Sequence, residues 1–301
     1  MADNSTTNNT INKSWRPATN LVRGGTHRSN FAETNEGIFL TSGFVYETAE
    51  QAQRAFKGEE DRFIYSRFSN PTVGMFEERM ALLENAKACR ATATGMAAVN
   101  AALAASVKAG DRLVASKALF GSCDYICREL LPKFGVETTM VNGTDLDEWE
   151  AALNKPTAAV FMETPSNPQM DIIDIEKVSK IAHKVGARVI VDNVLATPIL
   201  QKPLEFGADV VIYSTTKHID GQGRAMGGCV LTNDIEWSDG DLKQYMRHTG
   251  PSLSPFNAWV HLKSLETLEI RVQHHCRSAQ KVAEFLESQK VIKKVLFPGL
   301  E

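Results

Sequence analysis

Lys217 and Asp192 are the two residues whose types and surroundings most clearly indicate chemistry. Lys217 comes just after the apolar run 210–213, and Asp192 directly follows the apolar run 189–191. A lysine that loses hydration is favoured as the free amine, which can condense with a carbonyl group. An aspartate at the end of a nearby strand is the acidic partner that a pyridinium nitrogen needs. Either residue alone is more often a surface lysine or a turn aspartate, but the pair in this order predicts pyridoxal phosphate (PLP) as cofactor.

Donors for a phosphate group occur at two further places. Thr94-Gly95-Met96 opens an apolar stretch that is expected to be a helix. The free N–H groups and the dipole of a helix start favour an anion. Ser214 and Thr216 are two residues apart, so on an extended strand end their hydroxyls lie on the same side. Thr94 alone is more often an ordinary N-cap, and only the two sets together predict a phosphate site.

Three aromatic or basic residues could complete such a site. Tyr65 and Arg67 share one side of an extended segment before the turn at Pro71, and a guanidinium suits phosphate through its paired donors. Phe120 follows an expected strand, where a flat ring can stack on a heteroaromatic cofactor. The alternatives are a surface arginine beside a structural tyrosine, and a core phenylalanine. The sequence leaves both readings open.

Composition limits the classes of function. The 301-residue chain is 43% hydrophobic and carries 33 Lys and Arg against 36 Asp and Glu, for a net charge of −3. This balance gives no global basic field for nucleic acid or an anionic membrane, so a small-molecule substrate is expected. The chain shows neither a long apolar span nor the basic-then-apolar start of a signal peptide, so we predict a cytoplasmic protein.

Five scattered cysteines form no paired CxxC spacing, which argues against a disulfide framework or a structural zinc site. They are expected to be reduced thiols that fill core space. No metal site is predicted.

Apolar runs and helical periodicity predict an α/β fold. Strands are expected over 112–116, 136–141, 158–163, 188–192, 209–214 and 228–232, and helices over 75–84, 95–107, 122–133, 145–153, 175–185, 256–271 and 275–286. Continuous Val and Ile runs between helices are typical of a mostly parallel sheet covered on both faces. Ligands of such sheets lie at the carboxyl ends of the strands, where Asp192 and Lys217 are both expected.

Four regions are expected along the chain. Residues 1–20 are predicted to be a flexible tail and 21–70 an extended arm that packs on another surface, for which a partner subunit is one candidate. Residues 71–255 form the expected cofactor-binding domain. The last region, 256–301, is predicted to contain linking helices and a strand over 291–296. Such a strand has no sheet beside it, so we expect it to open a smaller C-terminal domain that is largely absent from this chain.

Several local motifs in this order resemble the Cys/Met-metabolism family of PLP enzymes, and the resemblance extends over about 21–301. They are Tyr65-x-Arg67 with Asn70-Pro71-Thr72, Thr94-Gly95-Met96, the run ETPSNP at 163–168, Val191-Asp192-Asn193 and Ser214-x-Thr216-Lys217-His218. Further phrases at 23–26, 39–46, 118–122 and 217–224 are similar to the branch of the family that acts on O-succinylhomoserine.

The resemblance implies a fold-type-I, aminotransferase-like architecture with a seven-stranded sheet, and a role for each matched residue. Lys217 would bind the cofactor covalently and move protons, and Asp192 would hold the pyridine nitrogen. The phosphate would be held by Thr94, Gly95, Met96, Ser214 and Thr216 and, from a neighbouring subunit, by Tyr65 and Arg67. Asn167 would lie beside the phenolic oxygen, and Phe120 would stack on the ring. A homotetramer built from dimers with shared sites is implied.

The activity implied is γ-replacement on O-succinyl-L-homoserine by sulfide, giving L-homocysteine and succinate in methionine biosynthesis. Two alternatives stay open. Cystathionine γ-synthase or a methionine or cystathionine γ-lyase is one, although Phe120 stands where most relatives have a tyrosine, which counts against it. A truncated PLP-binding remnant without catalysis is the other, because the family's small domain supplies an arginine for the substrate α-carboxylate.

Overall fold

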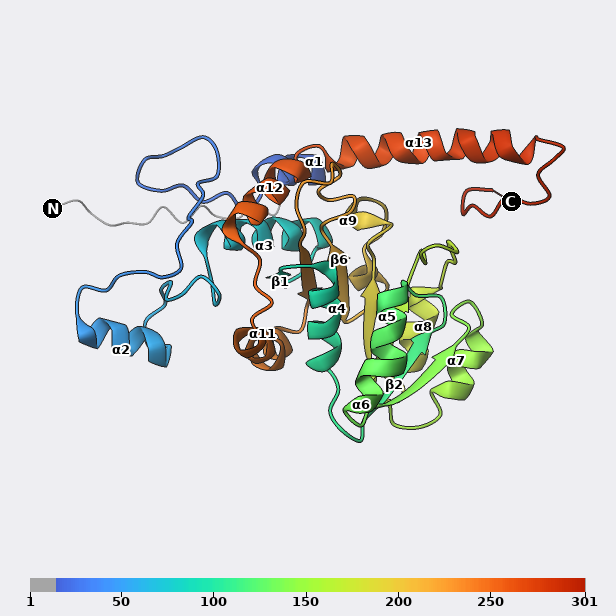
Figure 1. The fold of residues 1–301 in the computed structure, drawn as a ribbon, viewed down its shortest axis with the longest axis horizontal. Helices are drawn as coiled ribbons and strands as arrows, with labels where there is room; N and C mark the ends of the chain where they lie inside the picture. Colours follow the sequence, from blue (N-terminus) through green and yellow to red (C-terminus); the bar gives the residue numbers. More distant parts are fainter. Residues whose placement is uncertain (1–14, 301) are drawn as a thin grey trace.

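A seven-stranded sheet lies at the centre of the computed structural model, which describes residues 15–300 (Figure 1). The strands are β1 (Ala88–Thr92), β2 (Arg112–Ser116), β3 (Glu137–Val141), β4 (Ala159–Glu163), β5 (Arg188–Asp192), β6 (Val210–Ser214) and β7 (Gly228–Thr232). Their order is β1-β7-β6-β5-β4-β2-β3. Only β7 runs antiparallel to its neighbours, β1 and β6. The predicted α/β fold with a mostly parallel seven-stranded sheet is confirmed.

Helices cover both faces of this sheet. The α-helices are α1 (Pro17–Arg23), α2 (Ala49–Lys57), α3 (Pro71–Glu84), α4 (Gly95–Ala104), α5 (Gly121–Tyr125), α6 (Leu131–Lys133), α7 (Leu146–Ala152), α8 (Ile175–His183), α9 (Thr197–Leu200), α10 (Ile235–Trp237), α11 (Lys243–Thr249), α12 (Pro255–Leu265) and α13 (Leu268–Glu287). Short π-helical and 3₁₀ segments are η1 (Ile126–Leu130), η2 (Pro203–Phe206) and η3 (Ser238–Leu242). None of the helices in the described part of the chain is long and apolar enough to cross a membrane.

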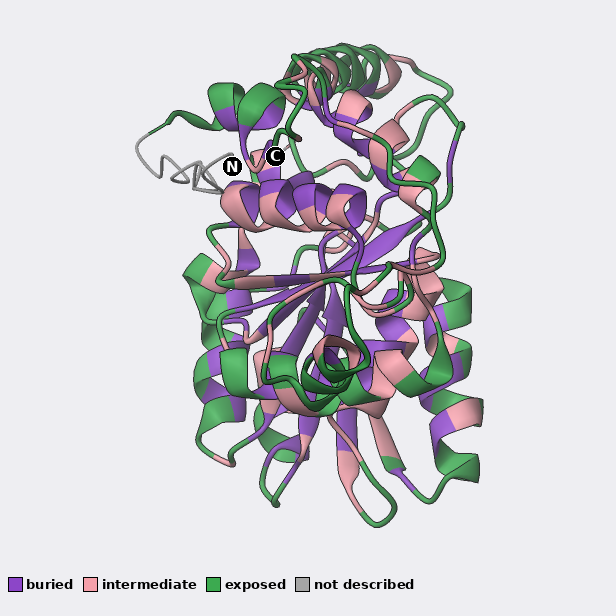
Figure 2. Cartoon of the chain, turned by 90° about the vertical axis from the view of Figure 1, so that its left-hand side faces the viewer, coloured by how far each residue is buried: buried purple, intermediate pink, exposed green. Residues whose placement is uncertain are grey.

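Alternate residues of the central strands contribute to two separate hydrophobic cores, one on each face of the sheet. Val189 and Val191 of β5 belong to the core that also contains residues of α3, α8 and α12, whereas Ile190 between them belongs to the core that contains residues of α4, α5 and η1. Side chains alternate between the faces of a strand, so a strand that is apolar throughout must be covered on both sides. Figure 2 shows the resulting buried sheet inside a partly exposed helical shell. This double covering leaves the strand ends as the place where polar side chains can gather.

The structure corrects several predicted elements. The seventh strand is β1, which the sequence analysis did not identify, and no strand forms over 291–296. A strand there would have no neighbour to supply ladder hydrogen bonds. The break between the last two helices falls at 266–267 rather than near 272–274, and the helix expected over 122–133 is divided into α5, η1 and α6. Helix α1 begins inside the predicted tail, where Asn20 is already buried; the rest of that tail, 1–14, lies outside the described residues.

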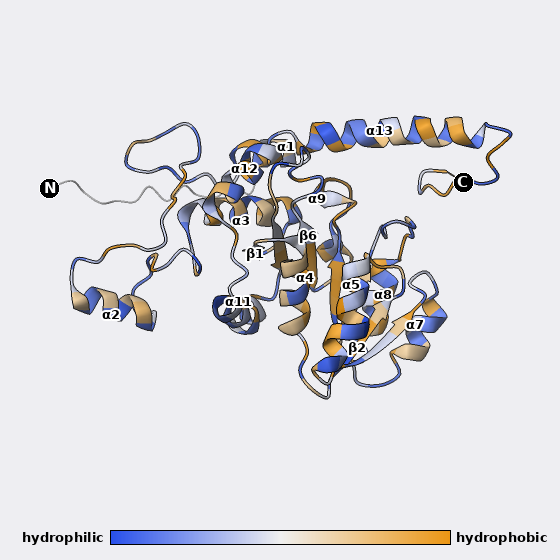
Figure 3. Cartoon of the chain, in the orientation of Figure 1, coloured by the Kyte–Doolittle hydropathy of each residue, from blue (hydrophilic) through white to orange (hydrophobic). Residues whose placement is uncertain are grey.

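The N-terminal arm extends away from the sheet and carries α2 at its far end (Figure 1). Its base is fixed by the buried ion pair between Glu36 and Arg79 of α3. Beyond the base the arm exposes large apolar side chains, including Leu40 at 68%, Val45 at 88% and Phe56 at 59%. Apolar segments are visible along the arm as well as in the sheet in Figure 3. Exposed apolar residues on an extended segment are typical of a surface that packs against a partner.

Candidate active site

The carboxyl ends of β4, β5 and β6 lie side by side and bring acidic and hydroxyl side chains together. Glu163 at the end of β4 is in register with Asp192 at the end of β5. Asp192 is in turn opposite Ile212 on β6, two residues before Ser214. The predicted location of Asp192 at a strand end is therefore confirmed. The edge combines two buried carboxyl groups with hydroxyls, which is an unusual set to remove from water without a ligand.

Asp192 has a buried carboxyl group with no cationic partner among the described residues. Its Oδ1 accepts a hydrogen bond from the Val194 N–H at 3.0 Å. Burial, together with the nearby charge of Glu163, raises the pKa of Asp192 to about 7. A protonated ring nitrogen would satisfy this carboxylate and lower its pKa again. The site therefore fits the pyridine nitrogen of PLP.

Glu163 holds two loops of the site with one carboxylate. Its Oε2 accepts the Phe120 N–H at 2.6 Å, and its Oε1 accepts the Asn167 N–H at 2.9 Å. The side chain is almost fully buried, and desolvation raises its pKa. From the sequence, Glu163 was assigned only as part of a motif. Its acidic type at the end of an apolar strand, in the same position as Asp192 on β5, was the signal for a role of its own.

The start of α4 forms a close-packed cradle over the ends of β6 and β7. The Thr94 hydroxyl caps the helix by accepting the Ala97 N–H at 3.0 Å. A Cβ on Gly95 would lie 2.8 Å from the Cα of Ser214, and one on Gly228 would lie 2.7 Å from the carbonyl carbon of Thr94. Only glycines allow this approach of helix start to strand end. The arrangement suits a phosphate held by helix N–H groups, and Gly228 is a residue that the sequence analysis missed.

The predicted phosphate ligands differ in their availability. The Thr216 hydroxyl donates to the Gly227 carbonyl at 3.2 Å and accepts the Gly227 N–H at 3.1 Å. Its bonding capacity is thus used within the loop. Ser214 makes no side-chain hydrogen bond to any other residue between 15 and 300, so its hydroxyl is available to a phosphate. Met96, also predicted to hold the phosphate, lies on α4 with its sulfur 4.0 Å from that of Cys123.

Lys217 lies in a turn beyond β6 rather than on the strand. Its N–H donates to the Ser214 carbonyl at 3.3 Å, and its own carbonyl accepts the Gly221 N–H at 2.7 Å. In this single chain Lys217 is exposed. The lysine does follow directly on Ser214 and Thr216 at the same edge as Asp192. That position allows an amine to reach a ligand seated between α4 and the strand ends.

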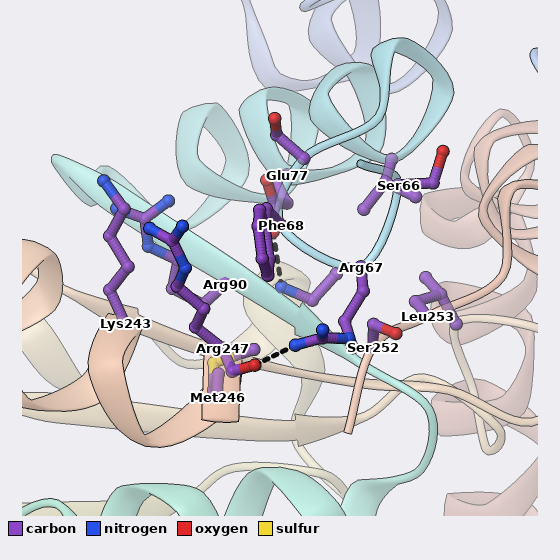
Figure 4. Close-up of a pocket in the computed structure, with 13 residues that line it drawn as sticks. Ser66, Arg67, Phe68, Glu77, Arg90, Lys243, Met246, Arg247, Ser252 and Leu253 are labelled. Carbon is purple, nitrogen blue, oxygen red and sulfur yellow. Dashed lines mark hydrogen bonds between the residues drawn. The ribbon is translucent and has the colours of Figure 1, made fainter. Parts of the chain in front are cut away.

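Tyr65 and Arg67 do not join this edge within the chain. Both lie on the arm, and Arg67 donates a hydrogen bond to the Arg247 carbonyl in a small pocket beside α11 (Figure 4). Phe120 and Asn167, in contrast, are brought to the edge by Glu163, and the Phe120 ring is 43% exposed. The structure therefore gathers the predicted residues into two groups, one at the sheet edge and one on the arm.

A buried polar network supports the strands beneath the site. The Tyr213 hydroxyl donates to Glu84 at 2.5 Å and accepts from the Asn193 side chain at 2.7 Å. Gln201 donates to Asn193 at 2.8 Å and to the Thr164 carbonyl at 2.9 Å. Burial raises the pKa of Glu84 to about 8. This network fixes Asn193, the neighbour of Asp192, from the side of the sheet opposite α4.

The α/β fold places acidic and hydroxyl side chains at the carboxyl ends of β4 to β6, beside the cradle at the start of α4. This arrangement defines a protein that binds a phosphorylated aromatic cofactor. The family model of Cys/Met metabolism PLP-dependent enzymes matches residues 18–301, and the chain belongs to that family. The resemblance and the cofactor expected from the sequence are both confirmed. Among the described residues, no group of His, Cys, Asp and Glu side chains has the arrangement of a metal site.

Curated relatives of this chain carry names of two activities. The chain is 56% identical to an O-succinylhomoserine sulfhydrylase of Mycobacterium tuberculosis, over 94% of this chain and 70% of that protein. It is 45% identical to one of Pseudomonas aeruginosa, over 93% of this chain and 69% of that protein. An L-methionine gamma-lyase of Porphyromonas gingivalis is 42% identical, over 94% and 71% respectively. The chain thus spans about 70% of the length of these relatives.

Solved structures agree with this assignment. The metB structure from Corynebacterium glutamicum has a TM-score of 0.90 and 34% identity, over 96% of this chain and 73% of that one. A putative O-acetylhomoserine (thiol)-lyase from Campylobacter jejuni has a TM-score of 0.91 and 32% identity, over 95% and 78%, and contains N'-pyridoxyl-lysine-5'-monophosphate. The expected fold class is therefore confirmed at high similarity.

Proposed function

We propose that this chain catalyses PLP-dependent γ-replacement on O-succinyl-L-homoserine with sulfide, giving L-homocysteine and succinate. The observation that carries the proposal is the buried Asp192 carboxyl group, which has no cationic partner within residues 15–300 and lies at the same sheet edge as the α4 cradle and the Lys217 turn. The named activity of the Mycobacterium tuberculosis relative at 56% identity supports the choice of substrates. Small-molecule chemistry of this kind is compatible with the predicted cytoplasmic location.

Each site residue has a proposed task. When bound, PLP supplies an electron sink for the bonds of the substrate α-carbon. Asp192 would keep the ring nitrogen protonated, and the N–H groups at the start of α4, with Ser214, would hold the phosphate. The Lys217 amine would remove the α-proton and then a β-proton as succinate leaves the γ-carbon, and would return these protons after hydrosulfide has bonded to that carbon, since Phe120 has no acidic proton to share that work. Asn167 would orient the substrate carboxylate beside the cofactor.

The proposal includes a second copy of this chain. The arm exposes apolar residues and carries Tyr65 and Arg67 away from the Asp192 edge of its own chain. Packing of the arm on a second copy would bury these apolar residues and bring both side chains to the phosphate held there. A dimer with shared sites, and a tetramer of two dimers, would follow. Size-exclusion chromatography with light scattering tests this assembly.

A γ-elimination on methionine or cystathionine is the second candidate, favoured by the L-methionine gamma-lyase relatives at up to 42% identity. Phe120 argues against it, because a tyrosine that can move protons stands there in most members of the family. Product analysis separates the two activities. Homocysteine formed from O-succinylhomoserine and sulfide supports replacement, whereas methanethiol and a 2-oxo acid formed from methionine support elimination.

Visible absorption of the PLP-loaded chain, before and after addition of O-succinylhomoserine, is the first test. We expect a cofactor band that shifts with substrate in the wild type and is lost in Lys217→Ala. Lys184→Ala, which removes an exposed lysine at the end of α8, is the matched control and should leave the spectrum unchanged. A normal substrate-dependent spectrum in Lys217→Ala would refute the assignment of the catalytic lysine.

A further inference from the structure

A small cation-lined pocket lies between the arm, α3, β1 and α11, and Arg67 is the one lining residue that already has a role in the proposed chemistry (Figure 4). Its cavity volume is about 70 Å³. One water needs only about 10–15 Å³ of such space, so a carboxylate with one or two waters fits, whereas a whole cofactor does not. Charged and aromatic residues among its lining include Arg67, Phe68, Glu77, Arg90, Lys243 and Arg247.

The pocket contains more positive charge than its own residues neutralise. Arg90 pairs with Asp239, so its charge is committed. Arg67, Lys243 and Arg247 form no ion pair with any residue of the described range 15–300. Glu77 is the one acidic side chain in the lining; its Oε1 accepts the Ala91 N–H at 2.7 Å, and burial raises its pKa to about 7. Near neutral pH the lining therefore combines one partly protonated carboxyl group with three cations that form no ion pair within residues 15–300.

Two of these cations are held in place by an aromatic ring. The guanidinium carbon of Arg247 lies 4.0 Å from the centroid of the Phe68 ring, and that of Arg67 lies 4.8 Å from it. A guanidinium stacked on a ring keeps its in-plane N–H donors free and loses little entropy when it binds a planar anion. Arg67 is also tied to the Arg247 carbonyl. Arg247 and Arg67 therefore lie against the same ring and contact each other, so a group that approaches Arg67 also comes near Arg247.

We propose that Arg247, assisted by Lys243, binds the terminal carboxylate of the substrate's succinyl group and so selects succinyl over acetyl esters of homoserine. This inference rests on the proposed function, in which the arm brings Arg67 to the active site of a second copy. A succinyl ester carries a carboxylate that an acetyl ester lacks, and that carboxylate takes no part in bond breaking. The Arg247 guanidinium can bind this carboxylate through two parallel hydrogen bonds, and Lys243 adds a second positive charge.

The test measures kcat/KM for O-succinylhomoserine and O-acetylhomoserine with sulfide, using the PLP-loaded chain. In Arg247→Gln the succinyl-to-acetyl ratio should fall roughly 10- to 100-fold, the size expected for loss of a charge-assisted pair, and mainly through KM. Arg247→Lys keeps a positive charge and should retain part of the preference. Arg277→Gln makes the same change at an exposed arginine on α13 that forms no ion pair within residues 15–300, and should leave the ratio at its wild-type value.

The second measurement does not depend on turnover. Succinate, with acetate for comparison, is titrated into the PLP-loaded wild type and Arg247→Gln while the cofactor absorption is followed. If the wild type turns over neither ester, the proposed function fails. The titration then decides the inference by itself. Tighter binding of succinate to the wild type than to Arg247→Gln supports the carboxylate site. A ratio within twofold of wild type in active Arg247→Gln, or equal succinate affinity where no turnover occurs, overturns it.

Discussion

Replacing Gly95 by alanine should damage the cofactor site in a way that the geometry specifies. Gly95 is the first residue of α4, and a Cβ there would lie 2.8 Å from the Cα of Ser214 on β6. Carbon atoms pack at about 3.5–4.0 Å, so the start of α4 must move by roughly 1 Å away from the strand. That movement separates the helix N–H groups from the Ser214 hydroxyl, the two groups that would share one phosphate.

Overpacking of this kind costs typically about 1–3 kcal/mol of stability. Loss of one well-aligned hydrogen bond to a phosphate should weaken PLP binding by roughly 10- to 100-fold in addition. Gly74→Ala is the matched control, because Gly74 lies inside helix α3 and a Cβ there meets no atom within 4 Å. Since alanine is the better helix former, that variant should gain up to about 1 kcal/mol.

Fluorescence titration with PLP gives the dissociation constant of each variant, and thermal unfolding without PLP gives the stability. We expect a weaker dissociation constant and a lower Tm for Gly95→Ala, with an unchanged constant and an equal or higher Tm for Gly74→Ala. If Gly95→Ala binds PLP as tightly as the wild type, the helix start does not hold the phosphate against β6. The assignment of the cradle would then be wrong.

Two further perturbations test the acidic groups. Asp192→Asn removes the negative charge proposed to face the ring nitrogen, so PLP should bind roughly 10- to 100-fold more weakly and turnover should fall by at least as much; equal affinity by titration would count against that role. Glu84 has its pKa raised from 4.5 to about 8 in the folded chain, so the native state binds the extra proton and stability must decline as pH rises through this interval. Glu84→Gln should make the free energy of unfolding decline less steeply between about pH 4.5 and about pH 8. Some decline should remain, because the pKa values of Glu77 and Asp192 are also raised to about 7. Parallel wild-type and variant curves would contradict the raised pKa of Glu84.

The sequence alone determined the elements whose signals are local. Apolar strand runs such as 188–192 and 228–232 were placed to the residue, because a strand covered on both faces is apolar throughout and is bounded by polar residues. The residues at their ends, Asp192 above all, could be found for the same reason. Lys217 and Asp192 predicted the cofactor as a pair, and the resemblance added a role for each matched residue, because the order of several short motifs is far more specific than any one of them.

Tertiary structure decided the features that depend on neighbours distant in the chain. β1 joins the sheet only by pairing with β7, about 140 residues further on, and 291–296 forms no strand because no partner lies beside it. The Glu163 carboxylate accepts hydrogen bonds from two loops, and Gly95 lies close to Ser214. These are contacts across the sheet edge, which no local sequence pattern encodes. The approach of Arg67 to Arg247 likewise unites residues 180 positions apart. The sequence predicted the chemistry of single residues, whereas the packing of the fold determined which of these residues share a site.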